Sequence, residues 1–247
     1  MSPRKTFATS RRVLAQLHHD PRTLVLLFVV PPVLITVLKY VFQNTAVFDH
    51  IAPMLLGIFP MVMMFLVTSI ATLRERSNGT LERLMTMPIG KVDFILGYAL
   101  AFSALAFVQA LIAAGVMLGV LHVTVLGGTL PTLIGAVLSA FLGTALGLFV
   151  SAFAATEFQA VQFMPAFIFP QLLVCGLFVA RDQMAKLLQW LADVFPLTYS
   201  VDAMKQITSH AGWTGTLMRD FAVVIAYAVA ALFLGSLTIR RQEWSAD

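Results

Sequence analysis

The sequence predicts an all-α membrane protein with six transmembrane helices. An amphipathic helix in the membrane interface precedes them, a short cytoplasmic helix joins spans two and three, and a re-entrant outer region joins spans five and six. Two observations support this class. The chain is 59% hydrophobic with a mean hydropathy of +0.88, whereas soluble domains contain about 45–50% apolar residues. The apolar residues also gather into runs of about 20, the length that crosses a bilayer as a helix.

The first element is a predicted amphipathic helix over residues 4–20. At 100° per residue, Phe7, Val13, Leu14 and Leu17 fall on one side, and Arg4, Lys5, Arg11 and Arg12 fall on the other. An apolar stripe flanked by arginine is typical of a helix lying in the interface. A solvated basic tail is the alternative.

Six apolar runs then follow, and too little chain lies between them for a separate soluble domain. We therefore expect residues 1–247 to form a single membrane unit. The predicted spans are residues 23–42, 51–73, 94–121, 130–155, 158–180 and 221–239. Prolines inside spans one, two and five free backbone carbonyls that neighbouring helices have to satisfy. In span four, small residues recur every four positions from Gly135 to Ala155, which predicts close helix packing within the chain rather than a dedicated dimer face.

The positive charges predict the orientation. With six spans, 11 of the 16 basic residues fall on the side of the two termini. Cytoplasmic loops carry the excess of lysine and arginine, so both termini are expected in the cytoplasm, with the chain in the plasma (inner) membrane of a bacterium. The lone Cys175 excludes an intrachain disulfide.

The segment between spans two and three is the most unusual part of the chain. Residues 74–83 hold five charges, although only 11% of the chain is charged. Gly79 permits a turn and Thr80 can cap a helix, after which Leu81 and Leu84 share one face until Pro88 ends the element. Such a helix suits either a partner's groove or the lipid headgroups, and its residues alone leave both open.

The outer loop before span six, residues 181–220, combines a helix-like apolar stretch around Trp190 with Tyr199 and Trp213. Trp and Tyr favour the membrane–water boundary. We expect short helices here that dip back towards the outer leaflet.

Motifs for catalysis are missing, so no catalytic residue and no metal site is predicted. The chain has no phosphate-binding loop, and no carboxylate stands clearly within a predicted span, which weakens an ion-coupled transporter. Polar and aromatic residues at membrane depth form a candidate substrate path, although a buried glutamine can equally join helices. The candidates are Gln109 in span three and Gln159, Gln162, Phe163, Phe167, Phe169 and Gln171 in span five.

Two regions resemble the type-2 ABC transporter permeases, the family of drug-resistance and polyketide-antibiotic exporters. The first is residues 75–84 with Pro88 and Lys91, and the second comprises residues 176–178, 189–191, 196–199 and 202–203. The resemblance covers nearly the whole chain. It implies that the helix after span two is a coupling helix that docks into a separate ATP-binding subunit. The residues implied for coupling are Glu75, Arg76, Gly79, Thr80, Leu81, Glu82, Arg83 and Leu84.

The resemblance also implies a function. It predicts the membrane subunit of an exporter for a hydrophobic or amphipathic molecule such as a drug, antibiotic or lipid, acting as a homodimer or heterodimer. This chain would hold no cofactor, since ATP and magnesium would bind the partner subunit. Nucleic acid is not an expected partner. A stand-alone channel or secondary transporter is the alternative, and a membrane enzyme lacks a catalytic cluster.

Overall fold

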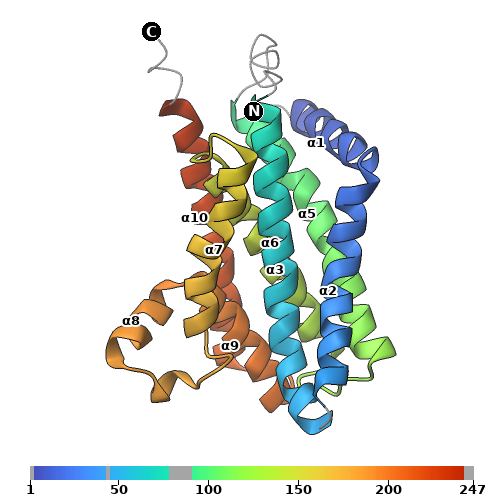
Figure 1. Cartoon of the computed structure of the whole chain (residues 1–247), viewed down its shortest axis with the longest axis vertical. Helices are drawn as coiled ribbons and strands as arrows, with labels where there is room; N and C mark the ends of the chain where they lie inside the picture. Colours follow the sequence, from blue (N-terminus) through green and yellow to red (C-terminus); the bar gives the residue numbers. More distant parts are fainter. Residues whose placement is uncertain (1–2, 43–44, 78–90, 242–247) are drawn as a thin grey trace.

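The computed structural model describes residues 3–42, 45–77 and 91–241, and all regular structure within them is helical (Figure 1). This confirms the all-helical prediction for the described part of the chain. The helices are α1 (Pro3–His18), α2 (Pro21–Val41), α3 (Thr45–Ser77), α5 (Lys91–Gly115), the π-helical turn η1 (Val116–Val120), α6 (Thr129–Ser151), α7 (Glu157–Val174), the 3-10 turn η2 (Arg181–Gln183), α8 (Lys186–Val194), α9 (Pro196–Ser209) and α10 (Gly215–Arg241).

Within the described residues, five helices are long and apolar enough to cross a membrane. They are α2, α3, α5 with η1, α6 and α10. The fifth predicted span, residues 158–180, corresponds to α7, which has only 18 residues and carries Glu157 and three glutamines. Its helix ends six residues earlier than predicted, at Val174, and Gly176 follows with a φ of +89°, a conformation that commonly terminates helices. Five crossings are therefore supported by length and composition, and the count of six is not confirmed.

Helix α6 occupies the middle of the bundle and packs along α3, with α5, α9 and α10 also against it (Figure 1). Glycine sets the distance between α6 and α3. A Cβ atom at Gly143 would collide with the carbonyl oxygen of Met61, and one at Gly147 would lie 2.6 Å from that of Phe65. A Cβ atom at Gly135 would meet Met204 of α9. The prediction that the small-residue ridge packs within the chain is thus confirmed.

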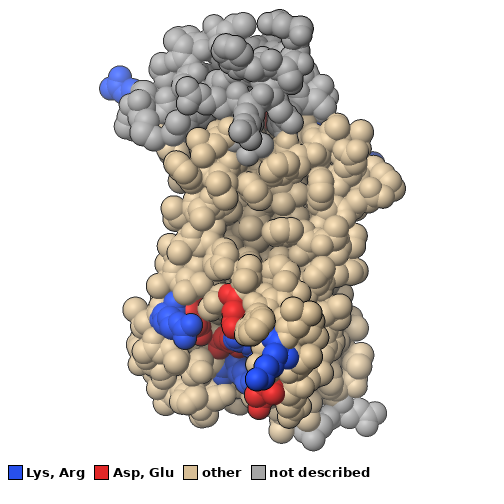
Figure 2. Space-filling view, turned by 90° about the vertical axis from the view of Figure 1, so that its left-hand side faces the viewer, with Lys and Arg blue, Asp and Glu red and all other residues tan. Residues whose placement is uncertain are grey.

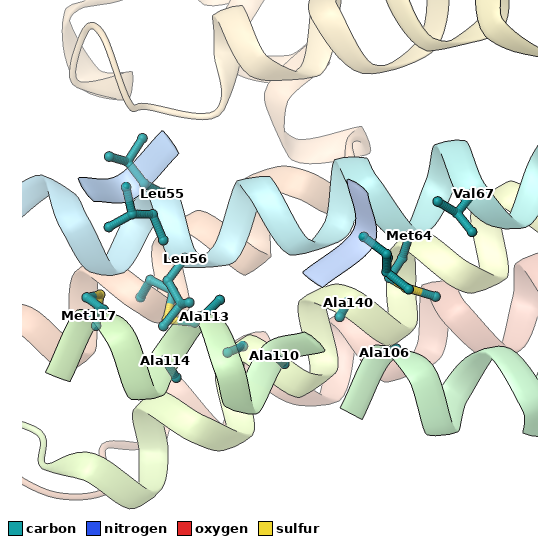
Figure 3. Packing of buried hydrophobic residues seen from close by; sticks show 14 of the residues in the cluster. Leu55, Leu56, Met64, Val67, Ala106, Ala110, Ala113, Ala114, Met117 and Ala140 are labelled. Atoms are coloured by element: carbon teal, nitrogen blue, oxygen red, sulfur yellow. The ribbon is translucent and has the colours of Figure 1, made fainter. Parts of the chain in front are cut away.

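Alanines on α5 also allow close helix packing. Ala106, Ala110, Ala113 and Ala114 are almost completely buried in the cluster that also holds Leu55, Leu56 and Met64 of α3 (Figure 3). Because lipid is as apolar as these side chains, close packing rather than water exclusion holds such helices together. Small residues on α5 and α6 therefore determine how tightly the bundle closes.

The two ends of the bundle differ. Helix α1, the end of α3, the start of α5 and the end of α10 share one end, and α8 and α9 lie at the opposite end (Figure 1). On the face seen in Figure 2, the acidic and basic side chains gather at the α8–α9 end, below a wide uncharged belt. An uncharged belt above a charged band is the surface expected of a membrane-embedded chain.

Candidate functional site

The predicted coupling residues begin where α3 ends. Glu75 and Arg76 lie in the last turn of α3, which ends at Ser77. The other six lie outside the described residues: Gly79, Thr80, Leu81, Glu82, Arg83 and Leu84. Helix α3 ends and α5 begins at the same end of the bundle.

Glu75 belongs to a polar cluster that joins three helices. Arg12 of α1 lies 3.5 Å from the Glu75 carboxylate and donates a hydrogen bond of 2.9 Å to the hydroxyl of Tyr98 on α5. Glu75 is 13% exposed and Tyr98 is 1% exposed. Polar contacts removed from water in this way fix helix geometry more firmly than exposed ion pairs do. The first coupling residue is therefore attached to both α1 and α5.

Arg74 joins the same region to two further helices. Its Nε and a terminal nitrogen donate to the two carboxylate oxygens of Glu157, at the start of α7, over 2.8 and 3.0 Å. Asp20, directly before α2, lies 3.9 Å from Arg74. The sequence does not predict these contacts, because the partners of Arg74 are distant along the chain.

Helix α1 packs against the bundle with the apolar side that the sequence predicted. Val13 and Leu17 are buried, whereas Phe7 is 66% exposed. A Cβ atom at Gly97 of α5 would lie 2.6 Å from Cβ of Thr9, so the glycine lets the two backbones approach. The part of the predicted apolar stripe around Val13 and Leu17 therefore packs against the protein. The part around Phe7 is exposed and can contact lipid.

Two glutamines of the predicted substrate path lie inside the bundle. Gln109 is completely buried and its Nε2 donates to the carbonyl oxygen of Leu27 over 3.2 Å. That carbonyl has lost its helical partner, because Pro31, four residues later, has no N–H. Gln109 therefore repairs the break that Pro31 makes in α2, as expected of a helix-joining glutamine.

Gln171 of α7 is also completely buried. Its Nε2 donates to the Phe167 carbonyl over 2.9 Å, and its Oε1 accepts from the backbone N–H of Leu197 over 3.3 Å. Leu197 lies in the first turn of α9, where backbone N–H groups lack helical acceptors. The contacts of Gln171 are those of a link between α7 and α9.

The remaining path residues follow α7 along more than one face. Gln159 makes two hydrogen bonds at the start of α7. Its Oε1 accepts from the backbone N–H of Ala155 over 2.8 Å, and its own backbone N–H donates to the hydroxyl oxygen of Thr156. Phe163 and Phe167 are half-buried, and Phe167 stacks on Phe65 of α3 at 6.3 Å. Gln162 and Phe169 are exposed on α7, as Gln159 is at its start, and Phe169 is 51% exposed.

The predicted outer region contains the expected short helices, α8 and α9. Arg181 pairs with Asp193 at the end of α8 and lies 2.5 Å from Asp202 of α9. Burial raises the pKa of Asp202 above its ordinary value, and Arg181 opposes that shift. Apolar residues dominate the exposed side of α8, with Leu187 73% and Trp190 69% exposed, which fits contact with lipid.

Asp220 is an acidic residue in a helix that was not predicted to include it. It was expected at the end of an outer loop, but α10 begins at Gly215 and thus includes it. Asp220 is only 7% exposed. The helix starts six residues before the apolar run that predicted the span, so Asp220 is buried in the first two turns of α10.

No group of three or more His, Cys, Asp or Glu side chains that could hold a metal occurs in the part of the chain that the structure describes.

Residues 4–208 match the family model of ABC-2 type transporters. ABC transporter G family member 20 of Dictyostelium discoideum is 23% identical over 204 residues, covering 81% of this chain and 28% of that protein. A probable multidrug ABC transporter permease, YbhR of Escherichia coli K12, is 26% identical over 157 residues, covering 64% of this chain and 43% of that protein.

The chain thus spans less than half the length of these curated relatives. The family match, however, runs from α1 to α9 and includes every predicted coupling residue. On that match, this multi-pass membrane chain belongs to the ABC-2 type transporter family.

Proposed function

We propose that the chain is the membrane subunit of an ATP-binding cassette exporter. In this proposal it moves a hydrophobic or amphipathic molecule out of the cell, and a separate subunit binds ATP and magnesium and hydrolyses the ATP. The observation that carries the proposal is the family match over residues 4–208, which includes the charged segment after α3.

The polar cluster at the end of α3 supports a coupling role for that segment. A force applied to residues 78–90 reaches α3 and α5 through the backbone, and Glu75 is in contact with α1 through Arg12. Arg74 extends the connection to α7 through Glu157. One contact with an ATP-binding subunit would therefore act on four helices together.

The proposal includes six crossings, with α7 as the short fifth one, and both termini in the cytoplasm of a bacterium. Two membrane subunits, identical or different, would enclose the substrate path. Gln162 and Phe169 are the path residues best placed for it, because they face outward from α7. The Nε2 of Gln109 and both amide atoms of Gln171 already make hydrogen bonds within the chain, so the proposed role of these residues is to support the path.

Two substitutions in the predicted coupling helix test the proposal. Leu81→Asp places a charge on its apolar face, and Gly79→Pro blocks the turn before it. Each should abolish transport and the stimulation of the partner ATPase, whereas membrane insertion stays normal. The measurement is ATP hydrolysis and export of a fluorescent amphipathic drug, with an ATP-binding cassette protein that copurifies with the chain co-expressed.

Leu126→Asp is the matched control, because Leu126 is 67% exposed in the loop before α6, at the opposite end of the bundle. It should leave ATPase stimulation unchanged. Normal export by both coupling variants would refute the assignment. Flux through the purified chain in liposomes without any ATPase would instead establish the channel or secondary-transporter alternative.

A further inference from the structure

A cavity of about 410 Å³ lies between α1, α2, α3 and α5, at the end of the bundle that carries the polar cluster. Cavities that hold small molecules in proteins measure about 300–1,000 Å³. Gln16 of α1 and Leu26 of α2 line it and are exposed, so it opens to the surface beside these helices. It lies within one chain, away from the outward-facing residues of α7.

The lining divides into an apolar and a polar part. Apolar side chains come from consecutive turns of α3 and from α5, among them Met63, Val67 and Phe102. Asp20 and Arg74 belong to the polar part. A cavity with an apolar body and one charged end matches an amphiphile. The apolar tail would contact the apolar lining, and the polar head would lie at the charged end.

The charges at the polar end favour a cationic head. Arg12 pairs with Glu75, and Arg74 binds Glu157 with two hydrogen bonds. Asp20 is left with a distant contact of 3.9 Å to Arg74, so these five groups carry one surplus negative charge. The hydroxyl of Thr23 donates to Asp20 over 2.6 Å, and this bond chiefly lowers the pKa of Asp20.

Asp20 is also accessible, since its side chain is 38% exposed. An ammonium group at the mouth of the cavity would meet an ionised carboxylate while its alkyl tail lies among the apolar side chains. We infer that this cavity binds an amphiphile with a cationic ammonium head and a single inserted alkyl tail.

Photolabelling of the full-length chain in phosphatidylcholine nanodiscs tests the inference. The probe is a dodecylammonium ion with a diazirine at the tail end, compared with a dodecyl sulfate probe carrying the same diazirine. Mass spectrometry of peptides should find the ammonium probe on α3 between residues 63 and 71, at several times the yield of the sulfate probe. Equal labelling by the two probes, or uniform labelling of all lipid-facing helices, would overturn the site.

Variants of the cavity test the binding of the alkyl tail and of the ammonium head separately. Ala71→Phe fills the cavity and should remove the α3 label, and Ala71→Leu serves as a milder filling variant if the larger residue disturbs folding. Ala230→Phe is the matched control, since Ala230 is exposed on α10 and outside the cavity. The probe should label α3 of this variant as strongly as α3 of the native chain. Asp20→Asn should lower the ammonium label roughly two- to fivefold, the effect of one partly exposed charge pair, and leave the sulfate label unchanged.

The natural head group has two possible sources, a phosphatidylethanolamine lipid and a free cationic amphiphile. Loss of the α3 label when phosphatidylethanolamine is added to the nanodiscs identifies the lipid, and persistence identifies the free molecule. Unchanged α3 labelling in both Ala71 variants refutes the cavity altogether. These measurements need no ATP-binding subunit, so they test the cavity independently of the proposed transport function.

Discussion

Gln109 shows at the scale of one residue how the bundle tolerates proline in a membrane helix. Pro31 leaves the Leu27 carbonyl without its helical N–H, and the buried amide of Gln109 replaces that donor. An unpaired carbonyl inside a membrane protein is costly because no water reaches it. Gln109 thus compensates on α5 for a residue that breaks α2.

This pairing predicts a compensating double variant. Gln109→Leu should lower the free energy of unfolding by about 1 kcal/mol, the typical net value of one buried hydrogen bond. In Pro31→Ala the backbone N–H of residue 31 can reach Leu27, so Gln109→Leu should then cost much less. The measurement is unfolding in mixed micelles for the four members of the cycle. Strictly additive effects would show that Gln109 does not act through the Leu27 carbonyl.

Asp20 and Thr23 determine where α2 begins. The Asp20 carboxylate accepts the Thr23 backbone N–H over 3.3 Å and the Thr23 hydroxyl over 2.6 Å, and Pro21 occupies the first helical position. Carboxylate caps satisfy a backbone donor and complement the positive end of the helix dipole. The short link between α1 and α2 is therefore defined by local chemistry.

Removing the cap should destabilise this element with a defined pH dependence. Asp20→Ala should cost about 1 kcal/mol at neutral pH, the usual value of a helix cap, and Asp20→Asn less, because the amide oxygen still accepts. The pKa of Asp20 is lowered in the folded chain from its ordinary 3.8. The contribution of its charge is therefore complete above pH 3.8 and disappears as pH falls through the lower folded value.

Thermal unfolding of the native chain and of Asp20→Asn over a pH series provides the measurement. The stability gap between them should stay constant down to about pH 4 and shrink on further acidification. A gap that widens in acid would contradict the assignment.

At the scale of the whole molecule, the cross-links at the α1 end unite helices that are far apart in the sequence. Arg12 and Glu75 are 63 residues apart, and Arg74 and Glu157 are 83 apart. Arg181 joins α8 and α9 at the opposite end. Ion pairs and hydrogen bonds therefore link the helices at each end of the bundle, and close packing of small residues holds the helices together between them.

The proposed topology predicts a labelling pattern for single cysteines. Cys175 is fully buried, so replacing it with serine should give a silent background. A membrane-impermeant maleimide should label Asp182→Cys and Ser209→Cys in intact cells, but Gln16→Cys and Ala155→Cys only after permeabilisation. All four positions are exposed in the chain, and each side contributes two of them.

The pair at 155 and 182 tests α7 in particular, because these residues stand before and after it. Labelling of both from the same side would reduce the count to five crossings. A complete reversal of the pattern would overturn the orientation.

Much of the fold was predictable because membrane helices are specified locally. Apolar runs located α2, α3, α5, α6 and α10, and the helical period located α1. Predictions failed where a helix end does not coincide with a change in hydropathy. Helix α10 starts at Gly215 within a polar stretch that includes Asp220, and α7 stops at Val174 inside an apolar one.

The candidate site was predictable to a smaller extent. The charged segment after α3 could be identified because its composition contrasts with its surroundings. The partners of Arg74, and the choice of Gln109 between lining a path and joining helices, depend on which helices become neighbours. Side-chain spacing along one helix contains no information about that choice.

The sequence by itself determined that this chain forms apolar helices with a charged connection between two of them. It could do so because a backbone in lipid must satisfy its hydrogen bonds within each segment. Only the tertiary structure decided that Arg12, Arg74 and Gln109 link one helix to another and that α1, α2, α3 and α5 border a cavity. Those features arise from contacts between residues more than 60 positions apart, which only the packing of the whole bundle brings together.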